Sequence, residues 1–177
     1  YPGTIDDELI PILQKLSKLR YKNDFYVGYS PERINPGDKI HTLENIIKVI
    51  ATDEKSSLRK MREIYNKIVK AGLYQASSIK VAELSKILEN TQRFINIALI
   101  NDISTLSNKM KIKTTDVIDA ASTKWNFVKY YPGLVGGHCI AVDPLYLAHK
   151  QKKIKVSSAL IEAADYLNKK KHLEIID

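Results

Sequence analysis

Residues 77–112 read SSIKVAELSKILENTQRFINIALINDISTLSNKMKI. This stretch contains neither proline nor glycine, the two residues that most disfavour the interior of a helix. Its apolar residues recur every three or four positions, which is the spacing of one face of an α-helix. The pattern predicts one long helix.

The residues before this stretch alternate between helical and extended patterns. Residues 4–19, TIDDELIPILQKLSKL, offer Thr4 as an N-cap, acidic residues in the first turn and apolar residues at helical spacing. Two strands are expected, DFYVGYS at 24–30 and NIIKVIA at 45–51, followed by an amphipathic helix at 53–69. The order helix, strand, strand, helix is typical of part of an α/β layer.

The residues after the long helix begin with TTDVIDAAST, residues 114–123, which predicts a short capped helix. Residues 123–142 are rich in glycine and aromatic residues and predict a loop, and residues 156–177 return to helical spacing. The turn signal Tyr1-Pro2-Gly3 has nothing before it, and the closing helix reaches Asp177 without a glycine or proline terminator. We therefore expect a piece of a longer protein.

The charge balance favours an anionic partner. The chain has 177 residues, 28 of them basic and 20 acidic, which gives a net charge of +8. The basic residues are scattered, and the short clusters at 150–155 and 169–171 predict solvated helix faces. Because no aromatic-rich sheet or groove-reading motif accompanies the charge, nucleic acid is the least favoured partner.

The composition also bounds the compartment. No apolar run approaches the roughly 20 residues that cross a bilayer, so we expect no membrane partner. The single cysteine forms no internal disulfide, and no secretion signal opens the chain. The expected location is the reducing cytoplasm.

That single cysteine lies in GLVGGHCIAVDPLY, residues 133–146. Backbone N–H groups of Gly136 and Gly137 can surround an anionic oxygen, and a thiolate at Cys139 can act as a nucleophile beside it. The alternative is that Cys139 is a small buried apolar residue and that the glycines turn the chain. A base role for His138 competes with an ordinary hydrogen-bonded histidine. A metal site from His138, Cys139, Asp143 and His149 has no recognised spacing.

Polar residues elsewhere suggest a second group of candidates. Lys86 and Asn90 are four residues apart on the long helix and therefore share a face, with Arg93 and Asn101 close to the same stripe. Glu32, in YSPERINPGD, lies where a strand gives way to a loop, as functional carboxylates often do. The alternatives are a solvent-facing helix surface and a surface turn acid.

Three segments, GYSPERINPGD, KILENTQRFINIALIND and GLVGGHCIAVDPLYL, occur in the order of the UDP-glucose/GDP-mannose dehydrogenase family and resemble its motifs. The sequences of the segments SPERINPGD and TKWNF are most similar to those of the bacterial UDP-N-acetylhexosamine 6-dehydrogenase branch, which makes uronic acids for capsule and O-antigen. The resemblance implies a UDP-sugar substrate and NAD as cofactor. The dinucleotide fingerprint G-x-G-x-x-G is absent, so the NAD site is expected mostly outside this chain.

The resemblance implies a mostly α fold. Residues 1–72 would be the C-terminal part of an α/β, Rossmann-type NAD domain. Residues 73–154 would be a central helical dimerisation and catalytic domain, similar to the C-terminal domain of 6-phosphogluconate dehydrogenase. Residues 155–177 would be a connecting helix towards a UDP-binding domain. A homodimer would form through the helix at 78–109, whose apolar residues lie on more than one face and include Ile87, Phe94, Ile97, Ile100 and Ile103.

The resemblance also assigns roles to single residues. Cys139 would hold the sugar as a thiohemiacetal and then a thioester, while the sugar C6 alcohol is oxidised twice to a carboxylate. The residues implied to assist catalysis are Lys86, Asn90, Asp143 and Glu32. The residues implied to bind substrate are Gly136, Gly137 and Lys124. The family's UDP-glucose enzymes carry a second glutamate where this sequence has Pro36.

Two functions from different classes follow. In the first, the chain is the covalent-catalysis part of an NAD-dependent UDP-N-acetylhexosamine 6-dehydrogenase and is inactive by itself. In the second, it is a catalytically inert helical dimerisation module.

Overall fold

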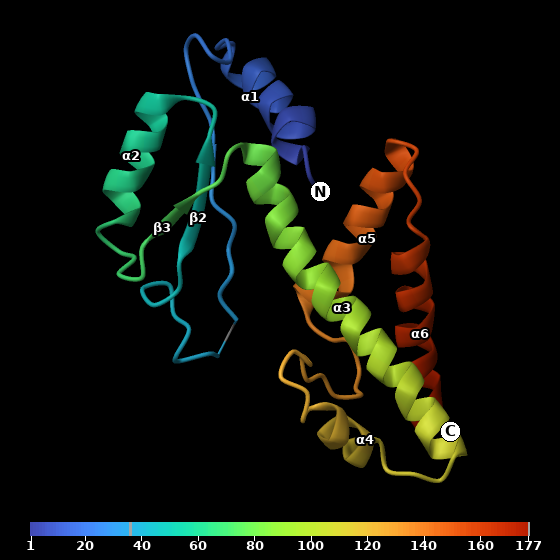
Figure 1. Ribbon diagram of the computed structural model, residues 1–177. Coiled ribbons are helices and arrows are strands. Elements are labelled where there is room, and N and C mark those ends of the chain that lie inside the picture. The colour runs from blue at the N-terminus through green and yellow to red at the C-terminus, as the bar shows by residue number, and fades with distance from the viewer. Residues whose placement is uncertain (36, 177) are drawn as a thin grey trace. The chain divides into compact units, whose positions relative to one another are not determined.

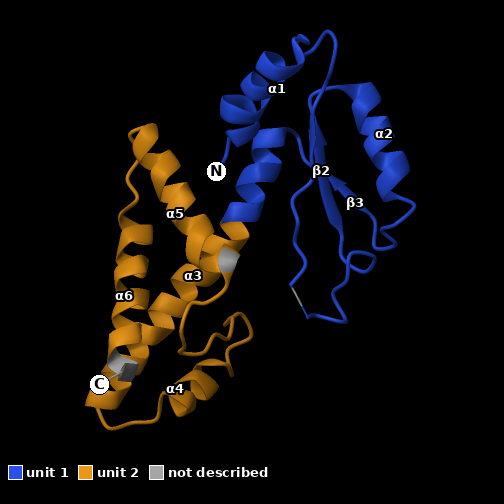
Figure 2. Ribbon diagram, turned by 180° about the vertical axis from the view of Figure 1, so that it is seen from behind, with its two compact units in different colours: residues 1–87 blue, residues 88–177 orange. Residues whose placement is uncertain are grey.

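The computed structural model describes residues 1–35 and 37–176 and divides them into two compact units, residues 1–87 and residues 88–177 (Figure 2). Pro36, where the sequence departs from the UDP-glucose enzymes, lies outside the described residues, as does the side chain of His138. Over half of the chain is helical, and one small sheet accompanies the helices. The expectation of a mostly α fold is confirmed for the content of helix and strand.

The first unit is an α/β unit. A π-helix, η1, spans Ile5–Leu9 and continues into α1, Ile10–Ser17. Strands β1, Gly28–Tyr29, and β2, Lys48–Thr52, precede helix α2, Lys55–Tyr65, and strand β3, Leu73–Gln75. The sheet order is β1-β2-β3. Strand β2 pairs antiparallel with β1, with Gly28 opposite Thr52, and parallel with β3, with Lys48 opposite Leu73.

The core of this unit follows from the alternation of side chains along β2. Val49 and Ala51 point to one face, where they pack with Ile10 of α1 and with Ile79, the first residue of helix α3, Ile79–Lys109. Ile50, which is fully buried, points to the other face, which is covered by α2 (Figure 1). The result is a sheet with helices on both faces, which is the α/β layer that the sequence predicts.

The predicted elements of the first unit agree only approximately with the structure. The strand expected at 24–30 is reduced to Gly28–Tyr29, since Pro31 has no N–H to continue the ladder. The side chain of Thr4 bonds to Tyr1 rather than capping the helix. Strand β3 was not predicted, because three residues are too few for a period to be recognised.

The second unit is helical. Helix α3 spans Ile79–Lys109, and its residues from Leu88 onward belong to this unit, together with α4, Thr114–Ala121, α5, His138–Lys153, and α6, Ala159–Ile176. Phe94 and Ala98 of α3 and Ala164 of α6 form its core. The predicted long helix and both shorter helices at 114–123 and 156–177 are therefore present.

The prediction of a loop over residues 123–142 is wrong for its last five residues. The loop ends at Gly137, and α5 begins at His138 and includes Cys139. Two helix breakers explain the error. Gly137, with a φ of 82°, is the N-cap, and Pro144 lies buried inside α5, where it cannot donate to the carbonyl of Ile140. A proline shortly after paired glycines normally marks a loop, but here α5 continues through Pro144.

Candidate active site

Cys139 is the second residue of α5, and its thiol is free and exposed. The backbone N–H groups of a helix N-terminus carry partial positive charge, so this position suits a group that reacts as an anion. The positive φ of Gly137 requires glycine at the turn into the helix. A side chain at Gly136 would meet no atom within 4 Å. The backbone ahead of the cysteine is therefore open, and Gly136 is not needed for packing.

Asn90 and Asp143 meet directly. The Asn90 Nδ2 donates to Asp143 Oδ2 at 2.5 Å, which links α3 to α5 within the second unit. Asp143 lies four residues after Cys139, and because both belong to α5 they share a helix face. Both Asn90 and Asp143 are half-buried. The structure thus brings three predicted site residues, Cys139, Asp143 and Asn90, into one neighbourhood.

The loop before Cys139 is fixed by a buried carboxamide. Asn101, on α3 and only 2% exposed, accepts from the Gly133 N–H at 2.9 Å and donates to the Gly133 carbonyl at 3.0 Å. It also donates to Asn168 Oδ1 at 3.1 Å, and Asn168 of α6 donates to the carbonyl of Phe94 at 3.2 Å. Asn101 was noted as a polar residue of the long helix, but its contact with the loop was not predicted.

Apolar contacts support the same loop. Val135 and Ile140, one on each side of the glycine pair and Cys139, pack against the core formed by Phe94, Ala98 and Ala164. The segment that presents Cys139 is therefore held by hydrogen bonds at Gly133 and by burial on both sides of the open glycines.

Two predicted lysines have simpler surroundings. Lys86 is half-buried on α3 within the first unit, one helical turn before Asn90 on the same helix. Lys124 is exposed in the turn that follows α4, where its N–H donates to the Ala121 carbonyl at 3.2 Å.

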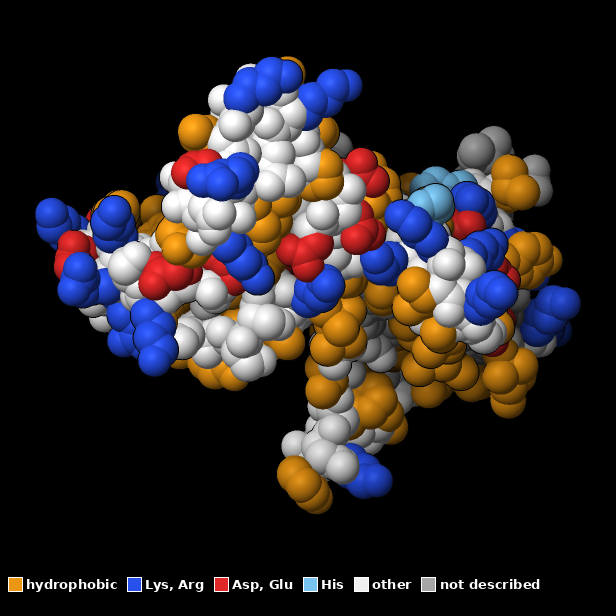
Figure 3. All heavy atoms as spheres, turned by 90° about the horizontal axis from the view of Figure 1, so that it is seen from above, with side chains coloured by type: hydrophobic (Ala, Val, Ile, Leu, Met, Phe, Trp, Pro, Cys, Tyr) orange, Lys and Arg blue, Asp and Glu red, His pale blue; other side chains and the backbone are white. Residues whose placement is uncertain are grey.

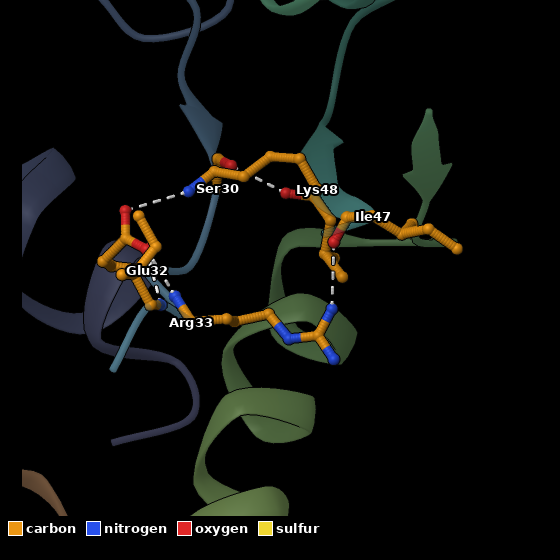
Figure 4. Close-up of polar contacts among 7 residues, drawn as sticks. Ser30, Glu32, Arg33, Ile47 and Lys48 are labelled. Atoms are coloured by element: carbon orange, nitrogen blue, oxygen red, sulfur yellow. Dashed lines mark hydrogen bonds and ion pairs between the residues drawn. The ribbon is translucent and has the colours of Figure 1, made fainter. Parts of the chain in front are cut away.

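Glu32 lies in the loop after β1, in the first unit. Its Oε1 accepts from the N–H groups of Arg33 at 2.7 Å and Ile34 at 2.9 Å, and its Oε2 pairs with Lys48 Nζ at 3.2 Å (Figure 4). Burial raises the pKa of Glu32, but the Ile34 N–H, the Lys48 ammonium and the Arg33 N–H together outweigh burial and hold that pKa below its ordinary value. Glu32 is therefore an ionised carboxylate in a defined orientation, not a loose surface acid.

Other groupings receive no support from the described residues. Among them, no set of three or more His, Cys, Asp or Glu side chains is arranged to hold a metal ion. On the face shown in Figure 3, basic side chains are interspersed with acidic and apolar ones. In the part of the chain that the structure describes, no helix is both long and apolar enough to span a membrane.

Comparison with known proteins gives the class of the protein. Residues 1–69 match the NAD binding domain and residues 80–170 match the central domain of one group of dehydrogenases. That group is the UDP-glucose/GDP-mannose dehydrogenase family, and the chain belongs to it.

Individual relatives agree with this membership. The UDP-N-acetyl-D-glucosamine 6-dehydrogenase of Salmonella typhi is 50% identical over 168 residues, which are 95% of this chain and 40% of that protein. Protein CapL of Staphylococcus aureus is 49% identical over 168 residues, which are likewise 95% of this chain and 40% of that protein. The solved structure of the UDP-N-acetyl-mannosamine dehydrogenase Cap5O from S. aureus is 30% identical, with a TM-score of 0.81, over 99% of this chain and 41% of that one. The chain spans about 40% of the length of these relatives.

NAD is the cofactor of the matched N-terminal domain. The glycine fingerprint that seats a dinucleotide pyrophosphate does not occur in residues 1–177, and the described strands of the first unit are not followed by such a turn. The residues present therefore do not form the pyrophosphate site, and we assign none of them to NAD.

Replacing Asn101 tests the anchored loop. Asn101→Ala leaves both backbone groups of Gly133 and the Oδ1 of Asn168 without their Asn101 partner, so we expect a loss of about 3 kcal/mol in the free energy of unfolding. Hydrogen exchange at the Gly133 amide should also become faster. The matched control is Asn108→Ala, an exposed asparagine of the same helix, which should change neither quantity. An equally protected Gly133 amide in both variants would contradict the anchoring role.

Proposed function

We propose that this chain is the covalent-catalysis part of an NAD-dependent dehydrogenase that oxidises the C6 alcohol of a UDP-N-acetylhexosamine to a carboxylate. The observation that carries the proposal is the exposed Cys139 at the N-terminus of α5, beside the hydrogen-bonded pair of Asn90 and Asp143. Family membership and the 50% identity to a UDP-N-acetyl-D-glucosamine 6-dehydrogenase support it.

Cys139 is the nucleophile in this proposal. The thiolate adds to the C6 aldehyde and forms a C–S bond, and the carbonyl oxygen takes up a proton to give a thiohemiacetal. NAD, when bound to the whole enzyme, would supply the two-electron acceptor for both oxidations, that of the C6 alcohol to the aldehyde and that of the thiohemiacetal to a thioester. Water then attacks the thioester carbonyl, and the C–S bond breaks to release the carboxylate and return the thiol.

Asn90 and Asp143 orient groups around the reacting carbon. Asp143 accepts from Asn90, which fixes the carboxamide so that its remaining groups can hold the substrate oxygen or a water. Lys86, which the family resemblance assigns to the same step, supplies positive charge where oxyanion character develops.

Glu32 is the carboxylate that we assign to thioester hydrolysis. It is ionised, and three donors fix its orientation, which are the properties of a group that accepts a proton from an attacking water. We also assign Gly136 and Gly137 to the substrate, since packing within this chain does not require glycine at Gly136. Lys124 is assigned to the diphosphate on the basis of its charge and exposure.

We further propose the setting and the limits of the chain. The cytoplasm, the synthesis of uronic acids for capsule or O-antigen, and the domain bounds 1–72, 73–154 and 155–177 rest on the resemblance of the motifs. In this proposal the UDP-sugar is the substrate, and neither nucleic acid nor a membrane is a partner.

A chimera tests the activity. In the chimera, this chain replaces the matching 168-residue segment of the S. typhi relative, whose remaining residues supply the rest of the protein. We expect two NADH for each UDP-N-acetylglucosamine consumed, with the uronic acid as product. Cys139→Ala in the chimera should lower the rate of uronic acid formation by a factor on the order of 10³ or more, as expected when the nucleophile is lost. A folded chimera that reduces no NAD would favour the inert dimerisation module instead.

We also propose that the chain dimerises through α3. The apolar residues that we expected at the interface are mostly used internally, since Ile87, Phe94 and Ile100 are buried. A different set is exposed on the portion of α3 in the second unit, and its successive spacings of eleven, seven and four residues keep it near one face of the helix, as in a packed helix seam. Its members are Leu88, Leu99, Leu106 and Met110.

Breaking this seam tests the dimer. Leu99→Glu combined with Leu106→Glu places two charges on the seam, and we expect dissociation to monomers at micromolar concentration in analytical ultracentrifugation. Leu16→Glu, on the exposed face of α1, is the matched control and should leave the dimer intact. A monomer for the unaltered chain would remove the proposal.

A further inference from the structure

One lysine of the first unit is buried. Lys48, the first residue of β2, is 4% exposed, although lysine is almost never fully buried unless it is paired. It points to the face of the sheet that α2 covers, and its Nζ lies 5.9 Å from the centre of the Tyr65 ring at the end of α2. Its anionic partner is Glu32, at 3.2 Å.

The pairing of β1 with β2 explains why these two residues meet. Gly28 is opposite Thr52, and Tyr29 is opposite Ala51. Continuing that antiparallel register beyond the end of β1 places Glu32 directly opposite Lys48. The chain stays close to β2 over this distance, because Ser30 Oγ donates to the Val49 carbonyl at 2.7 Å. The ion pair is thus a cross-strand pair at the point where the hydrogen-bond ladder has stopped.

The contacts of the carboxylate leave much of the Glu32 side chain exposed. The two N–H groups of Arg33 and Ile34 occupy Oε1, and Lys48 occupies Oε2, while 62% of the Glu32 side chain remains exposed. The Arg33 Nη1 donates to the Ile47 carbonyl at 3.2 Å (Figure 4). The charged groups around Glu32 are therefore Lys48 from β2 and Arg33 from its own loop, with Tyr65 of α2 behind the lysine.

We propose that Lys48 is a positioning residue that orients the Glu32 carboxylate for its role in hydrolysis. The role of Glu32 is that of the proposed function, and the inference about Lys48 rests on it. A proton acceptor must be both deprotonated and held within hydrogen-bond reach of the attacking water. A flexible surface lysine would provide the charge without the orientation. A lysine fixed by burial in a strand provides both.

The direction of the Glu32 pKa is consistent with this role. Burial alone raises that pKa, and the Ile34 N–H, Lys48 and the Arg33 N–H reverse the effect. Removing the ammonium leaves burial opposed only by the two backbone donors. The pKa of Glu32 should then rise, and the carboxylate should be lost at higher pH than in the unaltered chain.

The first experiment measures the titration of Glu32 in the 177-residue chain, by NMR of its side-chain carboxyl carbon. Lys48→Met removes the charge and keeps a long apolar side chain that suits a buried strand position. We expect its Glu32 midpoint to move to higher pH, and Lys48→Arg to return it towards the original value. Lys70→Met is the matched control, because Lys70 forms an exposed pair with Glu44 at 2.5 Å in the same unit. It should leave the Glu32 midpoint unchanged.

The second experiment follows kcat against pH in the chimera. Lys48→Met should slow uronic acid formation on the order of 10-fold to 100-fold, the cost of a misplaced catalytic group, and should move the acidic limb of the profile to higher pH. Lys48→Arg should recover most of the rate. A Glu32 midpoint that does not respond to Lys48→Met overturns the inference. Failure of the unaltered chimera would overturn the proposed function, and the NMR titration would still decide whether Lys48 controls Glu32.

Discussion

Helix α3 contributes to the core of both units because it runs from Ile79 to Lys109 without a residue that would break it. Its first turns bring Ile79 and Ala82 to the core of the α/β unit, and its later turns bring Phe94 and Ala98 to the core of the helical unit. A proline or glycine in its interior would cost about 3 or 1 kcal/mol respectively. The uninterrupted helix is thus the constraint that lets one element supply apolar packing and site residues at fixed intervals.

A shared physical arrangement recurs in the two units. In each one, a carboxylate that we assign to the reaction is bound by a nitrogen donor from a different element: Asp143 by Asn90, and Glu32 by Lys48. Such donors fix the carboxylate direction and leave part of the group available to a ligand. Asn101 does the same for a backbone segment, since it holds Gly133 and leaves Gly136 and Gly137 open.

How much could be predicted from sequence depended on how local the determining interactions are. The 3.6-residue period of residues 79–109 is a local pattern, and the long helix was correctly predicted from it. Helix α5 was missed because Gly137 and Pro144 are local loop signals, whereas the packing of Val135 and Ile140 that supports the helix start is non-local. Lys48 was read only as part of a strand, because its partner follows from the β1 and β2 register, which the sequence alone does not specify. The roles of Cys139 and Lys86 came from family resemblance, not from period or spacing.

Trapping the covalent intermediate tests whether Cys139 carries the sugar during oxidation. In the chimera with Glu32→Gln, hydrolysis should be slow, so that rapid quenching during turnover with NAD and UDP-N-acetylglucosamine followed by peptide mass spectrometry should find the sugar as a thioester on the Cys139 peptide. The same treatment after Cys139→Ala should give no adduct. An unmodified Cys139 peptide, while two NADH are still formed for each sugar, would contradict the account.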